Sequence, residues 1–247
     1  MRTLILSDIH ANEPALSAVL EDAGKCDRII FLGDLANFGP HPAECVDLLM
    51  KYNPICIMGN HDELIVNTPE HFWDEWSWDE WSKRKLNENQ QSWIRHFKDS
   101  YVLDGHILLL HGAYAVDYDI LPTTPDYKIE QAFAKYLTPQ IDEIWFGHYH
   151  YQIDKTINGI TYRCIRPVGH HRDRDTRAGY SIYENDTITH HRVKYDLDQT
   201  IADFLASDAF ENYELKLEFA ELLRNAYHEK LLVKDIEQMK RDVRTTE

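Results

Sequence analysis

The sequence has few basic residues, few cysteines and no long apolar segment. Its 247 residues include 26 lysines and arginines against 42 acidic residues, so the formal net charge is −16. A surface this acidic repels nucleic acid and anionic membranes, and the missing basic stripe argues against nucleic-acid processing. No apolar run approaches membrane-spanning length, and the first residues are typical of a strand instead of a signal peptide. We therefore expect a cytoplasmic protein.

The four cysteines lack the spacing of a disulfide framework or of a thiolate metal site. No CxxC pair occurs among Cys26, Cys45, Cys56 and Cys164, which argues against a structural zinc site. The chain does contain 43% hydrophobic and 12% aromatic residues, enough for a sizeable core, and 14 histidines. Its length fits one large α/β domain or a domain with a helical appendage.

Short apolar runs alternate with amphipathic segments along most of the chain. The strands that this pattern predicts are 3–6, 28–32, 55–58, 106–110 and 143–146. The helices between them are predicted at 15–23, 43–51 and 128–137. The alternation indicates βαβ units and a largely parallel sheet. Two hairpins, 153–164 around Asn158-Gly159 and 180–192, predict an antiparallel half and hence a second, mixed sheet.

Two further segments are predicted to be helical. Residues 69–101 hold five of the six tryptophans. We interpret them as a helical insertion whose rings pack on the core, although a platform for stacking bases is conceivable. From residue 199 on, Phe219 and Leu222 belong to an apolar stripe at helical spacing. We predict a domain over 1–198 and a C-terminal helical extension over 199–247, which packs on the domain or on a second subunit of a homo-oligomer.

Polar residues follow the predicted strands at the point where each strand ends. They are Asp8 and His10, Asp34, Asn60 and His61, His111, and His148 and His150. One Asp-x-His pair alone would read as a helix cap and a surface histidine. The carboxyl ends of strands in an open α/β sheet meet where sites form, and five such ends favour a shared site.

The residue types at these strand ends indicate metal binding. Oxygen and imidazole ligands without thiolates suit Mn, Fe, Zn or Ni. So many ligands exceed the need of one ion, whereas two ions that share a bridging carboxylate would use them all. In hydrolases that displace at phosphorus, such ions lie about 3.5–4 Å apart.

The ordered motifs DIH, GD, GNHD, HG and GHYH resemble those of the calcineurin-like metallophosphoesterase superfamily, over residues 1–192. GDLANFGP at 33–40 looks like the GDLxxxGP of its small bacterial and archaeal phosphoesterases. VGHHRDRDTRAGY at 168–180 looks like their VGQPRDxxxRAxY segment. The resemblance implies an α/β fold, a four-layer αββα sandwich of two mixed β-sheets flanked by helices.

The resemblance also implies roles for individual residues. Asp8, His10 and His150 would hold the first of two divalent ions, Asp34 would bridge, and Asn60, His111 and His148 would complete the second. His61 would act as general acid or orient the phosphate. Arg172 and Arg177 would contact the phosphate, with surface ion pairs as the alternative. The ions would neutralise the phosphate and lower the pKa of a bridging water that attacks in line.

Departures from the family pattern bear on the function. The eukaryotic-type protein phosphatases carry GDxxDRG and GNHE, whereas Asn37 and Phe38 replace the Asp-Arg pair here and Asp62 replaces the Glu. The charged clamp and the histidine-orienting Asp of that branch are thus missing, which argues against a phosphoprotein phosphatase. We expect a phosphoesterase that hydrolyses a small phosphomonoester, phosphodiester or nucleotide.

Two questions have alternative answers: the function of the chain, and the position of two of its histidines. A metal-binding scaffold for protein interaction is the other class of function that we consider, although no ligand is missing from the set. His170 and His171 follow a glycine, and we expect them to be exposed residues at a strand end, with a place in the pocket as the alternative.

Overall fold

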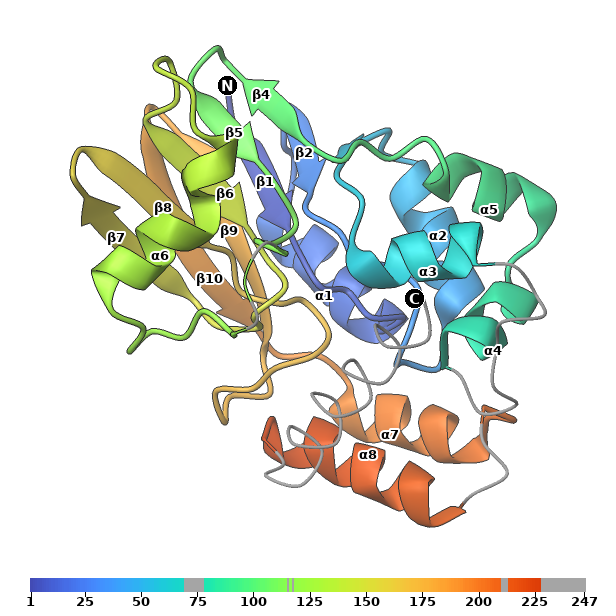
Figure 1. The fold of residues 1–247 in the computed structure, drawn as a ribbon. Helices are drawn as coiled ribbons and strands as arrows, with labels where there is room; N and C mark the ends of the chain where they lie inside the picture. The colour runs from blue at the N-terminus through green and yellow to red at the C-terminus, as the bar shows by residue number, and fades with distance from the viewer. Residues whose placement is uncertain (69–77, 115, 117, 210–212, 228–247) are drawn as a thin grey trace.

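Two stacked five-stranded sheets form the centre of the fold, as predicted (Figure 1). The computed structural model describes residues 1–68, 78–114, 116, 118–209 and 213–227. Within these residues, the strand orders are β10-β9-β1-β2-β3 and β4-β5-β6-β8-β7. Helices cover the outer face of each sheet, which confirms the predicted αββα sandwich.

The first sheet contains β1 (Thr3–Leu6), β2 (Arg28–Phe31), β3 (Ile55–Cys56), β9 (Ala178–Glu184) and β10 (Thr187–Val193). β1, β2 and β3 are parallel, and β9 adds antiparallel to β1, with Leu4 opposite Ile182. The sequence placed the β9–β10 hairpin in the second sheet, which is wrong. β1 is buried on both faces, so the backbone N–H and C=O groups along its second edge need hydrogen-bond partners. The largely buried β9 supplies these partners.

The second sheet contains β4 (Tyr101–Leu103), β5 (Ile107–Leu109), β6 (Glu143–Phe146), β7 (Ile153–Ile157) and β8 (Ile160–Cys164). The β7–β8 hairpin has the predicted bounds, and β8 pairs parallel to β6. β4, which the sequence did not predict, begins at the last residue of the predicted helical insertion and pairs antiparallel with β5.

The alternation of side chains along the strands separates the core into layers. Leu4, Leu6 and Phe31 pack beneath α1 (Glu13–Ala23), α2 (Pro42–Met50), α3 (Asn60–Asn67) and α5 (Glu88–Ile94). Ile5 and Ile30 point the other way and meet Trp145 between the two sheets. α6 (Asp126–Phe133), followed by the short 3-10 helix η2 (Ala134–Tyr136), covers the second sheet. This packing brings the carboxyl ends of the parallel strands together.

The remaining helices lie at that end of the molecule (Figure 1). They are α4 (Trp78–Lys85), α7 (Leu197–Ala206) and α8 (Tyr213–Asn225). Phe219 of α8 packs with Phe204 of α7, and both contact Trp78 of α4 and lie close to Phe38. Trp78 therefore packs on the C-terminal helices, whereas Trp93 packs on the core, as predicted. Trp73 and Trp76, in the predicted insertion, lie outside the described residues.

Candidate metal centre

Loops at the carboxyl ends of β1, β2, β5 and β6 bring the predicted Asp and His ligands into one buried cluster. Asp8, His10, Asp34 and His150 form one group, and Asp34, His111 and His148 form another. In each group every residue offers one ligand atom, and these atoms lie within 4.8 Å of one another. Asn60, the first residue of α3, joins the second group, because its Oδ1 lies 3.0 Å from His148 Nδ1. Asp34 belongs to both groups.

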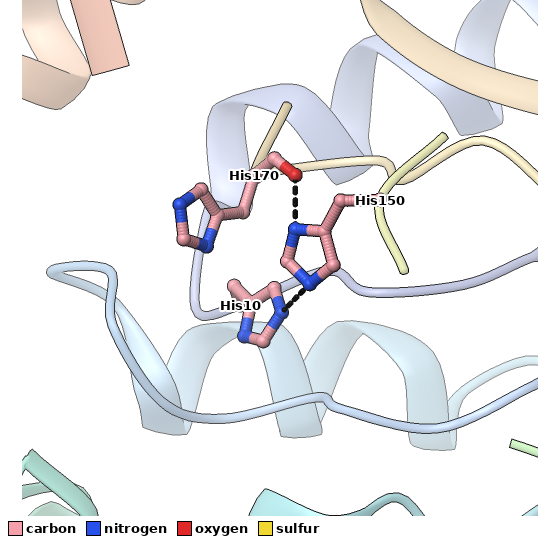
Figure 2. Close-up of side chains that lie close together, drawn as sticks. All are labelled: His10, His150 and His170. Atoms are coloured by element: carbon pink, nitrogen blue, oxygen red, sulfur yellow. Dashed lines mark hydrogen bonds between the residues drawn. The ribbon is translucent and has the colours of Figure 1, made fainter. Parts of the chain in front are cut away.

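The two imidazoles of the first group face each other through their Nε2 atoms (Figure 2). His10 Nδ1 donates to Asn37 Oδ1 at 2.6 Å, and His150 Nδ1 donates to the carbonyl oxygen of His170 at 2.6 Å. The Nε2 atom of each neutral ring is then unprotonated, yet the two Nε2 atoms lie only 3.2 Å apart. Asp8 Oδ1 lies 3.4 Å from His150 Nε2. A cation between these donors would relieve their repulsion, so the residues fit a metal ion.

The second group also brings potential ligand atoms close together. His111 Nδ1 donates to the carbonyl oxygen of Leu32 at 2.5 Å, which leaves Nε2 as the ligand atom, 3.1 Å from Asp34 Oδ2. Asn60 Oδ1 and His148 Nδ1 are separated by a similar distance. Neighbouring ligands of an octahedral ion with bonds of about 2.1 Å lie about 3 Å apart, which matches these spacings.

Burial and charge shift the pKa values within the cluster in both directions. Burial lowers the pKa of His10 and of His148 to about 3, so both imidazoles are neutral at physiological pH. Burial and the Asp34 charge raise the pKa of Asp8 to about 7. Burial would raise the pKa of Asp34 as well, but His111 and His61 outweigh it and hold that pKa well below its ordinary value. The carboxylates of Asp34 and Asp8 outweigh burial and raise the pKa of His111 to about 9, so that imidazole supplies positive charge beside the carboxylates where a bound cation would otherwise supply it.

The backbone at the cluster is strained. Five of the seven predicted ligands have a positive backbone φ, which residues other than glycine rarely adopt. They are Asp8 (51°), His10 (48°), Asp34 (64°), His148 (69°) and His150 (61°). Each such residue costs about 1–3 kcal/mol unless the surrounding structure enforces it. Here the Asp8 amide donates to the Gly33 carbonyl at 2.9 Å, and the His10 amide donates to the Asp34 carbonyl at 3.0 Å. Strain of this kind is concentrated at functional sites.

Two of the motif glycines are required by close approach of the ligand loops. A Cβ atom on Gly59 would collide with the backbone nitrogen and Oδ1 of Asp34. A Cβ atom on Gly147 would collide with Ser7 Oγ and would lie 2.7 Å from Asp8 Oδ2. The glycines of GNHD and GHYH therefore let neighbouring strand ends converge on the cluster.

His61 lies beside the cluster and is held by a carboxylate that sequence reasoning did not find. Its Nδ1 donates to Asp79 Oδ1 of α4 at 3.0 Å, and both residues are buried. Burial alone would lower the pKa of His61, but the charges of Asp79 and Asp34 outweigh it and raise the pKa to about 9. The histidine-orienting Asp that the GDLANFGP segment lacks is thus replaced by Asp79, 18 residues after His61 in the chain.

A comparison of the whole sequence with models of known protein families identifies the family of this chain. A model of the family described as calcineurin-like phosphoesterase matches residues 1–219. The chain belongs to the calcineurin-like phosphoesterase family. This confirms the resemblance drawn from the motifs, and membership supports a hydrolase of phosphate esters.

Solved structures of similar proteins share the fold of this calcineurin-like phosphoesterase. A metallophosphoesterase from Sphaerobacter thermophilus is 28% identical, with a TM-score of 0.74 over 92% of this chain and 99% of that one. Hypothetical protein PH1004 from Pyrococcus horikoshii OT3 is 18% identical, with a TM-score of 0.75 over 92% and 98%. Uncharacterized protein MJ0912 from Methanocaldococcus jannaschii is 43% identical over 60 residues, which is 24% of this chain and 25% of that protein. No helix in the described part of the phosphoesterase is long and apolar enough to cross a membrane.

Asp62 fixes the loops of the phosphoesterase site to one another. Its Oδ2 accepts from the amides of Asp34 at 2.8 Å and Gly59 at 3.1 Å, and its Oδ1 accepts from the amide of Leu35 at 2.8 Å. One carboxylate thereby joins the GD loop to the GNHD turn. In the sequence, Asp62 stood out only as a departure from the GNHE pattern, and no structural role was predicted for it.

The two predicted arginines differ in their surroundings. Arg177 is exposed, and its guanidinium donates to both carboxylate oxygens of Asp175, at 3.0 and 2.7 Å. Arg172 is half-buried. Burial is the main cause of the lowered pKa of His150, and the charge of Arg172 lowers that pKa further. The structure therefore places Arg172 within electrostatic range of the cluster and Arg177 in a surface ion pair.

The expectation that His170 and His171 are exposed is wrong, because both side chains are only 4% exposed. The loop that carries them is bound to the loop after β1, where the Gly169 amide donates to the Asp8 carbonyl at 3.0 Å. His170 lines a small pocket with Phe219 and Leu222 of α8. A glycine before the pair suggested a surface turn, but the loop folds inward beneath the C-terminal helices.

Proposed function

We propose that the chain is a dinuclear metal-dependent hydrolase of a small phosphomonoester, phosphodiester or nucleotide. The observation that carries this proposal is the pair of buried donor groups that share Asp34. The facing lone pairs of His10 and His150 and the buried carboxylates of Asp8 and Asp34 suit divalent cations such as Mn, Fe, Zn or Ni. Membership of the calcineurin-like phosphoesterase family supports the reaction class.

Each donor group would hold one ion. The first would be bound by Asp8, His10 and His150, the second by Asn60, His111 and His148, and both by Asp34. Two divalent cations held there would supply the charge that neutralises a phosphate and acidifies water. The chain itself contributes fixed positions, since Asp62 joins two of the ligand loops.

His61 is proposed to protonate the leaving oxygen. Because its Nδ1 proton is donated to Asp79, the second proton of the imidazolium, at Nε2, is the one available for transfer. Arg172 is proposed to steady the phosphate, because its charge acts on the same histidines. Arg177, the other predicted arginine, pairs with Asp175 and is the weaker candidate.

The test is phosphoester hydrolysis by metal-stripped protein reloaded with Mn²⁺. We expect turnover of p-nitrophenyl phosphate, of its bis ester or of a nucleotide, and at least a ~100-fold loss in Asp34→Asn, which removes the charge shared by both groups. Asp99→Asn, at an exposed carboxylate, is the matched control. Absence of Mn²⁺-dependent turnover on all three kinds of ester would overturn the proposal, and full metal loading without turnover would favour the scaffold.

A further inference from the structure

The ring of His170 is a buried polar group without a hydrogen-bond partner. Only 4% of the residue is exposed, and neither ring nitrogen bonds to any residue that the structure describes. A buried, unsatisfied polar group costs about 1–3 kcal/mol. An apolar side chain would fill the same space without this cost, so the imidazole calls for an explanation.

The His170 ring lies against the first donor group (Figure 2). His10, His150 and His170 each offer a ring nitrogen, and these three atoms lie within 4.8 Å of one another. The His170 ring centroid is 4.7 Å from that of His150 and 5.2 Å from that of His10, with the rings nearly perpendicular. A third imidazole thus stands beside two whose Nε2 lone pairs already face each other.

The neighbouring His171 provides an internal comparison. It is buried to the same extent, but its Nε2 bonds to the Val168 carbonyl at 3.2 Å, and Arg192 and Asp173 lie near it. His170 instead lies against the rings of His10 and His150, and neither of its ring nitrogens bonds to a residue that the structure describes. The His170 ring therefore offers the cluster a nitrogen that no hydrogen bond uses.

The backbone of His170 already takes part in the same group. Its carbonyl oxygen accepts the Nδ1 proton of His150 at 2.6 Å and so fixes the tautomer of that ligand. The preceding residue, Gly169, is bonded through its amide to the Asp8 carbonyl. The position of the His170 ring is thus tied to two other members of the group.

We propose that His170 is an additional imidazole ligand of the first cation, beside Asp8, His10, Asp34 and His150. This proposal rests on the proposed function, because it needs a cation in that group. The first ion would then bind three imidazoles, whereas the second would bind two, from His111 and His148. The relatives' segment that VGHHRD resembles has Gln at this place, so the added nitrogen ligand distinguishes this chain.

Binding of Co²⁺ to metal-stripped protein tests the proposal without reference to activity. Calorimetric titration gives the affinity of each site, and the visible absorption of bound Co²⁺ reports the ligands around it. The variant His170→Phe keeps a ring but removes the donor, and His171→Phe is the matched control. We expect His170→Phe to weaken one of two Co²⁺ sites by about tenfold or more and to shift its absorption, with His171→Phe like the wild type.

The outcomes separate this inference from the proposed function. Identical affinity and absorption in His170→Phe and wild type would overturn the ligand role, and a weaker affinity for inorganic phosphate alone would assign the ring to the substrate instead. A wild-type chain that binds no Co²⁺ would overturn the dinuclear site as a whole. If His170→Phe fails to fold, His170→Gln serves, since replacing nitrogen by oxygen at the ion must also shift the absorption.

Discussion

A single hydrogen bond gives Asp79 a role in the site. It accepts the Nδ1 proton of His61 at 3.0 Å, and it also accepts from Asn37 Nδ2 at 3.3 Å. The carboxylate therefore holds the imidazole in one orientation, with its other nitrogen available to a substrate. Asp79 is a positioning residue because it acts through His61.

The variant Asp79→Asn is expected to slow the hydrolysis of an ester to an extent that depends on its leaving group. A poor leaving group such as an alkoxide needs the proton from His61, so kcat for an alkyl phosphate should fall about 100-fold. For p-nitrophenyl phosphate, whose leaving group needs little protonation, the loss should be a few-fold, with KM little changed. Steady-state kinetics on both esters, with metal content measured in parallel, checks this. Equal losses on both esters, or no recovery in Asp79→Glu, would contradict a positioning role.

Residues in motifs could be predicted from the sequence, and residues that act through tertiary contacts could not. Asp8, Asp34 and His148 follow apolar strands, and the geometry of a parallel sheet brings such strand ends together. Asp79 lies in a helix of a segment whose tryptophans indicated core packing or a platform for stacking bases, and no role for a carboxylate. Its approach to His61 depends on how α4 packs, which no periodicity records. His170 was misjudged because a preceding glycine does not reveal whether a loop turns outward or inward.

At the level of elements, Asp154 of β7 joins the two sheets. It pairs with Arg163 of β8 at 3.0 Å and, across to the first sheet, with His190 of β10 at 3.0 Å. Burial would raise the pKa of Asp154, but its hydrogen bonds to His190, Gln152 and Arg163 lower it to about 2. A lowered carboxylate pKa stabilises the fold above the ordinary value of 3.8 and ceases to do so as pH falls through about 2.

The variant Asp154→Asn is therefore expected to lose stability in a pH-dependent way. Near pH 7 the free energy of unfolding should fall by about 1 kcal/mol, because partial exposure screens the full effect of the shift. The difference from wild type should shrink as pH falls from about 4 toward about 2, where the native carboxylate becomes protonated. Urea unfolding across this range gives the measurement, with Asp99→Asn as control. A difference independent of pH would show that the charge is not responsible.

The bounds of the strands were predicted better than the strands with which they pair. The β7–β8 hairpin has the bounds that Asn158-Gly159 indicated, yet the β9–β10 hairpin joins the first sheet. Alternation in a strand shows that one face is buried, but it does not say against which neighbour. α3 was missed because Gly59-Asn60-His61-Asp62 reads as a turn. In the structure Asp62 accepts from the Gly59 amide and caps the helix.

At the scale of the molecule, the acidic charge and the buried cluster together determine how metal affects stability. The net charge of −16 and the buried Asp8, whose pKa is raised to about 7, both disfavour the metal-free fold. A cation in each donor group binds the folded chain alone, because the unfolded chain does not bring the strand ends together. Metal binding must therefore raise the thermal stability of the protein.

Mn²⁺ is accordingly expected to raise the Tm of the metal-stripped protein, and a chelator to reverse the rise. At free Mn²⁺ one hundredfold above Kd, one site contributes about 2.7 kcal/mol, which corresponds to roughly 5–10 °C for a chain of this length. An acidic surface also attracts dications without any site, so the control must preserve that surface. Asp34→Asn does so, since it removes one of 16 net charges, yet it removes the carboxylate common to both groups. Scanning calorimetry should show most of the Mn²⁺ shift lost in Asp34→Asn, and an equal shift in both proteins would assign it to the surface, leaving the buried cluster without a metal.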